Sequence, residues 1–253
     1  MMSADPPVIT VDGPSGAGKG TLCYQLAKRL QWHLLDSGAL YRVTALAALE
    51  AGIDLSVADA GAKVLGEPGA AINDGSANAV SEAIAAIARN LAVSFVPSAN
   101  GGTRVMLSNS DVSTRIRLDD CSELASKVAA LKAVRVALLE RQKQMAKAPG
   151  LVADGRDMGT VVFPNAPLKF FLTASSQARA ERRRDQLLAQ GQSVTLARLL
   201  EAIEERDARD KSRVESPLVP AADAIVVDST ELSAEQVLVR ALQEAEVRNL
   251  LTS

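Results

Sequence analysis

Aromatic residues are scarce in this sequence: they make up 3% of its 253 residues, and only one of them is a tryptophan. A core built from such a chain has to be aliphatic, drawn from leucine, valine, isoleucine and alanine. The apolar share of 47% is typical of a globular protein. The length allows one large domain, or a core with one or two appendages.

Excess charge and cysteine are also lacking. The 28 basic and 30 acidic residues give a net charge of −2, which argues against a general binder of nucleic acid or membrane surfaces. Cys23 and Cys121 have no metal-type spacing, which indicates free thiols in a reducing compartment. The sequence shows no signal-peptide pattern, and no uncharged apolar run approaches the ~20 residues that span a bilayer. We therefore expect a cytoplasmic protein.

Short apolar runs alternate with helical patterns along most of the chain. Buried strands are predicted at residues 8–11, 151–154, 168–172 and 224–227, and a small antiparallel sheet around 103–107. Helices are predicted at 22–30, 38–51, 80–91, 119–147, 176–190, 195–212 and 233–250. This alternation predicts an α/β fold with a mostly parallel central sheet flanked by helices. Active sites in such sheets lie beyond the carboxyl ends of the strands, where Gly13 and Asp154 fall.

The segment from Gly13 to Lys19 fits the phosphate-binding pattern G-x-x-x-x-G-K, between an apolar strand and an amphipathic helix. Backbone N–H groups and the helix N-terminus would hold phosphate oxygens, and Lys19 would reach the β- and γ-phosphates. Gly20 stands where serine or threonine usually holds magnesium, and Thr21 comes one position late. We therefore expect Mg²⁺ to be carried by the nucleotide, and predict no direct metal ligand. The residues expected to bind ATP in this loop are Gly13, Pro14, Ser15, Gly16, Ala17, Gly18, Lys19, Gly20 and Thr21.

Arginines are concentrated on two predicted helices. Three share one helix face by their spacing (Arg179, Arg182 and Arg183), and a second face carries Arg206, Arg209, Asp210 and Arg213. One interpretation is a solvated surface with ion pairs to nearby glutamates. The other is phosphoryl transfer, in which a well-placed arginine is worth ~10³–10⁵ in rate. No N-K-x-D motif for guanine is present, which argues against a GTP-dependent switch.

Several motifs together resemble the bacterial cytidylate kinase family: GPSGAGKGT, LLDSGALYR, LVADGRDMGTVVFP, RDARDKSR and SPLVPAADA. The resemblance covers nearly the whole chain apart from about 56–91, where the insert is longer than is usual in the family. It implies a P-loop nucleoside monophosphate kinase fold and the reaction of ATP with CMP or dCMP to ADP and CDP or dCDP, with Mg²⁺, by a monomer. The implied division is a P-loop core (1–55, 117–175 and 214–253), an inserted monophosphate-binding domain (56–116) and a lid (176–213).

The resemblance also implies roles for individual residues. The phosphate of CMP would be clamped by Arg42, Arg156 and Arg213, its cytosine read by Ser126, Arg135 and Asp157, and its ribose held by Arg206 and Asp210. Asp36, Ser37 and Tyr41 are assigned to the same site. Arg179, Arg182 and Arg183 would close over ATP. The residues expected to act on the transferring phosphoryl group are Lys19, Arg156, Arg182, Arg183 and Arg213.

A carboxylate at Asp157 would accept from the N4 amino group of cytosine but would meet an acceptor oxygen in uracil, which disfavours UMP. Asp157 could instead only orient Arg156, and Ser126 could be an ordinary helix serine. Two other functions stay open: a kinase for another monophosphate or a small hydroxyl substrate, with Asp36 or Asp157 as base, and a regulatory protein that binds ATP without transferring phosphate. A regulatory protein would be distinguished from a kinase by whether a monophosphate accelerates ATP consumption.

Overall fold

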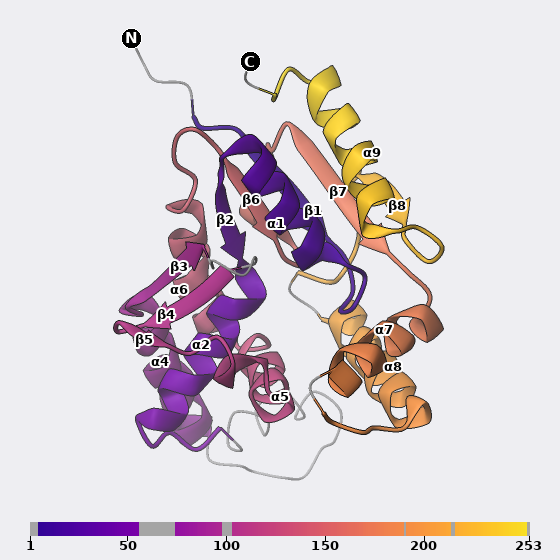
Figure 1. Ribbon diagram of the computed structural model, residues 1–253. Helices are drawn as coiled ribbons and strands as arrows, with labels where there is room; N and C mark the ends of the chain where they lie inside the picture. The colour runs from indigo at the N-terminus through magenta and orange to yellow at the C-terminus, as the bar shows by residue number, and fades with distance from the viewer. Residues whose placement is uncertain (1–4, 56–73, 98–102, 190, 214–215, 252–253) are drawn as a thin grey trace. The chain divides into compact units, whose positions relative to one another are not determined.

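The computed structural model describes residues 5–55, 74–97, 103–189, 191–213 and 216–251 (Figure 1). The chain forms two compact units. The first unit consists of Met1–Leu35 with Met145–Ser253, and the second unit is Asp36–Gln144. Among the described residues, no helix is both long and apolar enough to cross a membrane.

A five-stranded sheet forms the centre of the first unit, in the order β2-β6-β1-β7-β8 (Figure 1). Its strands are β1 (Val8–Asp12), β2 (His33–Asp36), β6 (Leu151–Asp154), β7 (Leu168–Thr173) and β8 (Ile225–Asp228). Strand β1 pairs in parallel with both β6 and β7, so that Val11 lies opposite Asp154 on one side and Phe170 on the other. Strand β7 also pairs in parallel with β8. The predicted parallel sheet is confirmed, and its central strands end at the same edge.

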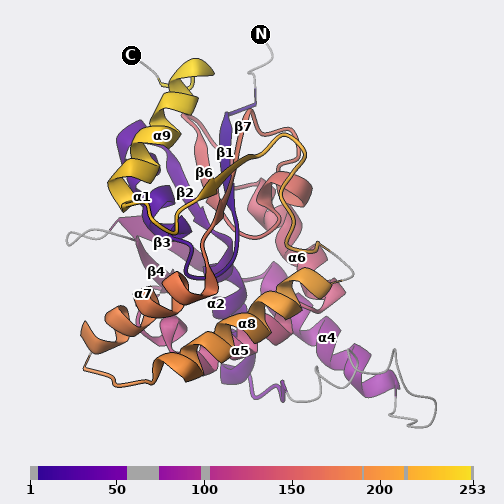
Figure 2. The same ribbon diagram turned by 90° about the vertical axis from the view of Figure 1, so that its right-hand side faces the viewer.

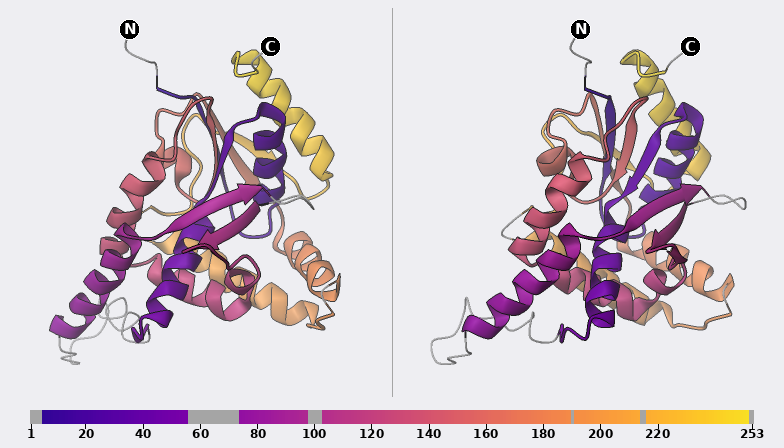
Figure 3. Two further views of the ribbon diagram at one scale, coloured as in Figure 1. Left: turned by 60° about the vertical axis from the view of Figure 1, so that its left-hand side comes forward. Right: turned by 90° about the vertical axis from the view of Figure 1, so that its left-hand side faces the viewer.

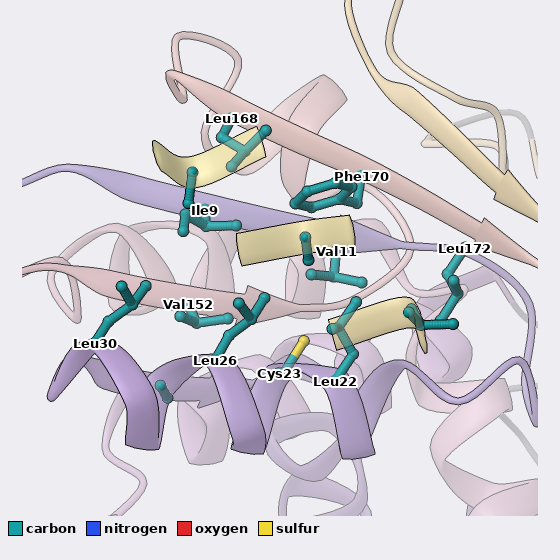
Figure 4. Packing of buried hydrophobic residues seen from close by; sticks show 14 of the residues in the cluster. Ile9, Val11, Leu22, Cys23, Leu26, Leu30, Val152, Leu168, Phe170 and Leu172 are labelled. Carbon is teal, nitrogen blue, oxygen red and sulfur yellow. The ribbon is translucent and has the colours of Figure 1, made fainter. Parts of the chain in front are cut away.

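Helix α1 (Lys19–Leu30) covers one face of this sheet through leucines that recur every four residues, at Leu22, Leu26 and Leu30. Figure 4 shows Leu22, Leu26 and Leu30 pointing at side chains of the central strands, among them Val11 and Phe170. These side chains are at most 7% exposed. Burying one leucine or phenylalanine of this kind stabilises the fold by about 1.5–3 kcal/mol, so this aliphatic layer fixes the start of α1 against the end of β1.

The other helices of the first unit are α7 (Ser176–Ala189), α8 (Leu196–Ser212) and α9 (Ala234–Val247), with a π-helical turn η2 (Met158–Val162). Helices α7 and α8 pack against each other (Figure 2). Helix α9 packs against α1 and begins with a capping box between Ser233 and Gln236, close to the predicted start of this helix at residue 233.

The second unit combines helices with a three-stranded antiparallel sheet of order β3-β4-β5, whose longer strands are drawn in magenta in Figure 3. Helix α2 packs against α5, and α4 packs against α6. A buried apolar cluster that includes Val43, Val105 and Ile116 joins α2 to the sheet. The elements of this unit are α2 (Ser37–Glu50), α4 (Asp74–Arg89), β3 (Val93–Pro97), β4 (Thr103–Leu107), β5 (Ser110–Asp111), η1 (Arg115–Arg117), α5 (Asp119–Val128) and α6 (Lys132–Lys143).

The grouping into units differs from the division that the sequence suggested. Residues 36–55 and 117–144 were expected in the core, but α2, α5 and α6 pack with α4 within the second unit. The single helix expected at 119–147 is two helices, because Leu131 has an extended backbone (φ −78°, ψ 118°). The first part of the long insert, residues 56–73, lies outside the described residues.

Candidate active site

The phosphate-binding loop leaves β1 at Asp12 and enters α1 at Lys19. Gly13 has φ +144°, and a Cβ atom there would lie 1.9 Å from the carbonyl oxygen of Leu172, so no other residue fits this position. Gly16 and Gly18 also have positive φ values, +80° and +94°. The glycines therefore let the backbone turn closely over the ends of the strands, which exposes N–H groups at the start of α1.

Lys19 points back into this loop rather than into solvent. Its side chain is buried, at 6% exposed, and Nζ donates a hydrogen bond of 2.8 Å to the carbonyl oxygen of Pro14. Burial, together with the guanidinium groups of Arg156 and Arg206, lowers the pKa of Lys19 to about 8, although the carboxylate of Asp154 raises it. The cations of three separate segments therefore converge on the phosphate-binding loop.

Asp154, at the end of β6, is a functional candidate that the sequence-based assignment left out. Its Oδ2 lies 3.6 Å from the point where a Cβ atom of Gly20 would be, and its charge acts on Lys19. A carboxylate at the second strand end beside the loop suits the hard cation Mg²⁺. The exposed Thr21 follows one residue later. In the described part of the chain, no group of three or more His, Cys, Asp or Glu residues could hold a metal ion.

Asp210 on α8 joins two of the predicted phosphate-binding arginines. Its carboxylate accepts from Arg156 Nε at 2.9 Å and pairs with Arg213 Nη2 at 2.6 Å. The side chains of Arg156 and Arg213 are 20% and 15% exposed, and that of Asp210 is 2% exposed. Burial favours the neutral acid, but the two guanidinium groups outweigh it, so the pKa of Asp210 lies below its ordinary value. The structure thus brings Arg156, Asp210 and Arg213 together.

The three arginines of α7 are not equivalent. Arg179 is buried, at 3% exposed, and donates to protein acceptors. Arg182 is partly buried and donates to Ser229 and Thr230, in the segment that follows β8. Arg183 is partly buried as well. The spacing that placed these residues on one helix face therefore gave no indication of their different partners.

The turn after β6 carries Asp157, which is 6% exposed. This turn is held in place by Asp12, a second residue that sequence reasoning missed. The carboxylate of Asp12 accepts from the backbone N–H groups of Met158 at 2.8 Å and Gly159 at 2.7 Å. A Cβ atom on Gly159 would lie 2.9 Å from Thr10 Oγ1, so glycine is required for this close approach. The only sequence signal for Asp12 is an acidic residue at the end of an otherwise apolar strand.

The second unit holds the other predicted CMP contacts. Asp36 caps α2 by accepting from the N–H of Ala39 at 2.8 Å. A Cβ atom on Gly38 would lie 3.2 Å from Asp36 Oδ1 and 3.5 Å from Arg42 Nη2, so these two side chains flank the first turn of α2. Ser37 and Tyr41 are buried in the same helix, at 3% and 9% exposed.

Ser126 lies on α5, and Arg135 lies in the first turn of α6. Both are partly buried, and Arg135 Nη1 donates to the carbonyl oxygen of Ala129, between the two helices, at 3.3 Å. The predicted contacts therefore fall into two sets, one in each unit. That the two sets form a single CMP site stays a prediction.

A glycine-rich loop between a parallel strand and a helix, with a lysine and convergent arginines, defines a P-loop phosphotransferase. The sequence model of the cytidylate kinase family matches residues 9–247. Curated cytidylate kinases from Salmonella choleraesuis and Citrobacter koseri are each 54% identical over 96% of this chain and 97% of their own length. The chain belongs to the cytidylate kinase family and is a kinase.

A solved sugar kinase from Janibacter is similar at 13% identity, with 98% of this chain and 99% of that chain covered and a TM-score of 0.38. The fold assignment therefore rests on the parallel sheet and on the curated relatives. The predicted α/β fold of the P-loop kinase class is confirmed.

Proposed function

We propose that the chain transfers the γ-phosphoryl group of ATP to CMP or dCMP, giving ADP and CDP or dCDP. The curated relatives carry the name cytidylate kinase at 54% identity over nearly the full chain. The acceptor oxygen belongs to a phosphate whose second pKa is about 6, so it is largely ionised near neutral pH and needs no general base. Positioning and charge stabilisation are then the main tasks of the protein.

The observation that supports this proposal most is the convergence of cations on the phosphate-binding loop. Arg156 and Arg206 come from the turn after β6 and from α8, and both act on Lys19 strongly enough to lower its pKa. Cations held this close together repel one another unless anions share them. Asp154 and Asp210 supply two such anions, and the phosphates of two nucleotides would supply more.

Each set of residues has a distinct task in the proposed reaction. Lys19 would bridge the β- and γ-phosphates, and Arg156, Arg182, Arg183 and Arg213 would follow the charge that spreads over the transferring group. Arg42, Arg206 and Asp210 are assigned to the phosphate and ribose of CMP, and Asp36, Ser37 and Tyr41 are assigned to the same substrate. Asp157, Ser126 and Arg135 would read the cytosine.

Mg²⁺ is the proposed cofactor. When bound, it neutralises charge on the β- and γ-phosphates and holds them in one geometry. Asp154, whose carboxylate lies beside Gly20, is the residue that would help the nucleotide to hold it, which revises the expectation of no direct protein ligand. We further infer that the enzyme acts as a cytoplasmic monomer on small nucleotides and not on nucleic acid.

A coupled assay of ADP release across CMP, dCMP, UMP, AMP and small hydroxyl acceptors tests the proposal. CMP and dCMP are expected to give the highest kcat/KM, and CDP is expected to form in equal amount to ADP. A higher kcat/KM with AMP or UMP would refute the acceptor assignment. CMP binding without CDP formation at saturating ATP and Mg²⁺ would identify a nucleotide sensor instead.

A further inference from the structure

Arg179 on α7 uses every donor that an arginine has. Its five N–H groups go to the carbonyl oxygen of Ala174 (3.0 Å), the carbonyl oxygen of Ser15 (3.1 Å), Ser176 Oγ (3.1 Å) and both carboxylate oxygens of Asp207 (3.0 and 2.5 Å). The side chain is 3% exposed. A guanidinium in this position has no further N–H group to offer a phosphate.

The bond to Ser15 reaches into the phosphate-binding loop itself. The next residue, Gly16, lies against the stem of Arg179: a Cβ atom there would be 3.2 Å from Arg179 Cβ and 3.5 Å from Cγ. Arg179 therefore contacts two successive loop residues, one by a charge-assisted hydrogen bond and one by packing. Both contacts restrict the backbone whose N–H groups hold phosphate.

Asp207 fixes the direction of this guanidinium. It lies on α8 between Arg206 and Asp210, both of which belong to the predicted CMP contacts, yet its carboxylate forms a two-oxygen pair with Arg179. The next acid along the helix, Asp210, pairs with Arg156 and Arg213 instead. Neighbouring acids of one helix thus serve different parts of the first unit.

We propose that Arg179 and Asp207 act together as positioning residues for the ATP loop, and that Arg179 does not bind ATP directly. This inference rests on the proposed function and replaces the expectation that Arg179 closes over ATP with the other lid arginines. It implies that Asp207 acts on the ATP side of the reaction, although its neighbours on α8 are assigned to CMP.

Three variants test the proposal. Asp207→Asn keeps the shape of the side chain and removes its charge, and Arg179→Lys keeps the positive charge but loses the planar guanidinium that donates to both carboxylate oxygens. The third is the double variant. Each single variant is expected to raise the KM for ATP about tenfold, which is the effect of losing one charge-assisted hydrogen bond. The KM for CMP is expected to stay within about twofold. The double variant is expected to match the worse single variant, since both changes remove one interaction. Glu204→Gln, at an exposed carboxylate on the same helix, is the matched control and leaves both KM values unchanged.

Titration of each variant with ATP in the absence of acceptor gives the Kd independently of turnover. A tenfold weaker Kd for ATP supports the positioning role even if the acceptor is not CMP. The positioning proposal and the proposed CMP kinase activity can therefore be refuted independently of each other. Melting curves show whether a variant is folded, and if Asp207→Asn is not, Arg179→Lys and Asp207→Glu carry the same comparison.

Two results would overturn the inference. A rise in the KM for CMP equal to or above that for ATP would place Asp207 in the acceptor site. Loss of turnover in Arg179→Lys with an unaffected Asp207→Asn would show that Arg179 contacts ATP itself.

Discussion

Replacing Asp12 by asparagine gives a test of the fold beneath the active site. Burial raises the pKa of Asp12 from its ordinary 3.8 to about 6, even though the N–H groups of Gly159 and Met158 and the charge of Lys19 favour the ionised form. A difference of about 2 pH units between the folded and unfolded chain corresponds to about 3 kcal/mol. This is a sizeable share of the stability of a typical domain.

The sign of the effect follows from proton binding. Between about pH 4 and pH 6 the folded chain holds more protons at Asp12 than the unfolded chain does, so this carboxyl contributes less to the free energy of unfolding as the pH rises through that window. Asparagine does not titrate. The free energy of unfolding of the wild type minus that of Asp12→Asn is therefore expected to fall by about 3 kcal/mol from about pH 4 to about pH 7.

Urea denaturation followed by circular dichroism across this pH range measures the difference directly. Asp185→Asn, which removes an exposed carboxylate of α7, controls for the loss of one negative charge. A wild-type-minus-variant difference that stays constant with pH would refute the reasoning. A difference that grows with pH would show that the two N–H bonds outweigh burial.

Three further predictions concern the loop and the acceptor. Lys19→Ala is expected to lower kcat by orders of magnitude while keeping a cooperative melting transition, because the hydrogen bond that its Nζ donates to the Pro14 carbonyl stays within the loop; loss of that transition would show a structural role. Gly13→Ala is expected to destabilise the fold by about 3 kcal/mol or more, since its Cβ would overlap a backbone oxygen; Gly20→Ala, where the nearest atom is 3.6 Å away, is the control, and equal melting temperatures would contradict the steric argument. Asp157→Ala is expected to reduce the CMP-to-UMP ratio of kcat/KM more than ATP affinity, and an unchanged ratio would remove Asp157 from cytosine recognition.

The sequence contained enough information for the parts of the fold that depend on local patterns. The β-branched run before Gly13 predicted β1, and leucines at four-residue spacing predicted the buried face of α1. The glycine-rich segment identified the loop because strand, turn and helix follow one another directly. Ser233 lies at the N-cap of α9, where its side chain accepts a hydrogen bond from the backbone, and serine is one of the residues favoured there.

Other features depend on contacts between distant segments and had no local signal. Strand β2 has only four residues and runs straight into α2, and the sequence pattern predicts no strand there. The break between α5 and α6 falls in a stretch without glycine or proline, where helix propensity predicts continuation.

The bonds of Asp12 to residues 146 and 147 positions later, and of Arg179 to an acid 28 positions later, appear only when the strands and helices are assembled. A pattern of arginines on one helix face could not distinguish a residue that binds a ligand from one that holds the loop.

The bond from Lys19 to the carbonyl of Pro14 has a consequence for the end of the catalytic cycle. If Lys19 binds the β- and γ-phosphates as proposed, its ammonium group would return to the Pro14 carbonyl oxygen when ADP leaves. This exchange of one oxygen acceptor for another would lower the electrostatic cost of releasing the product.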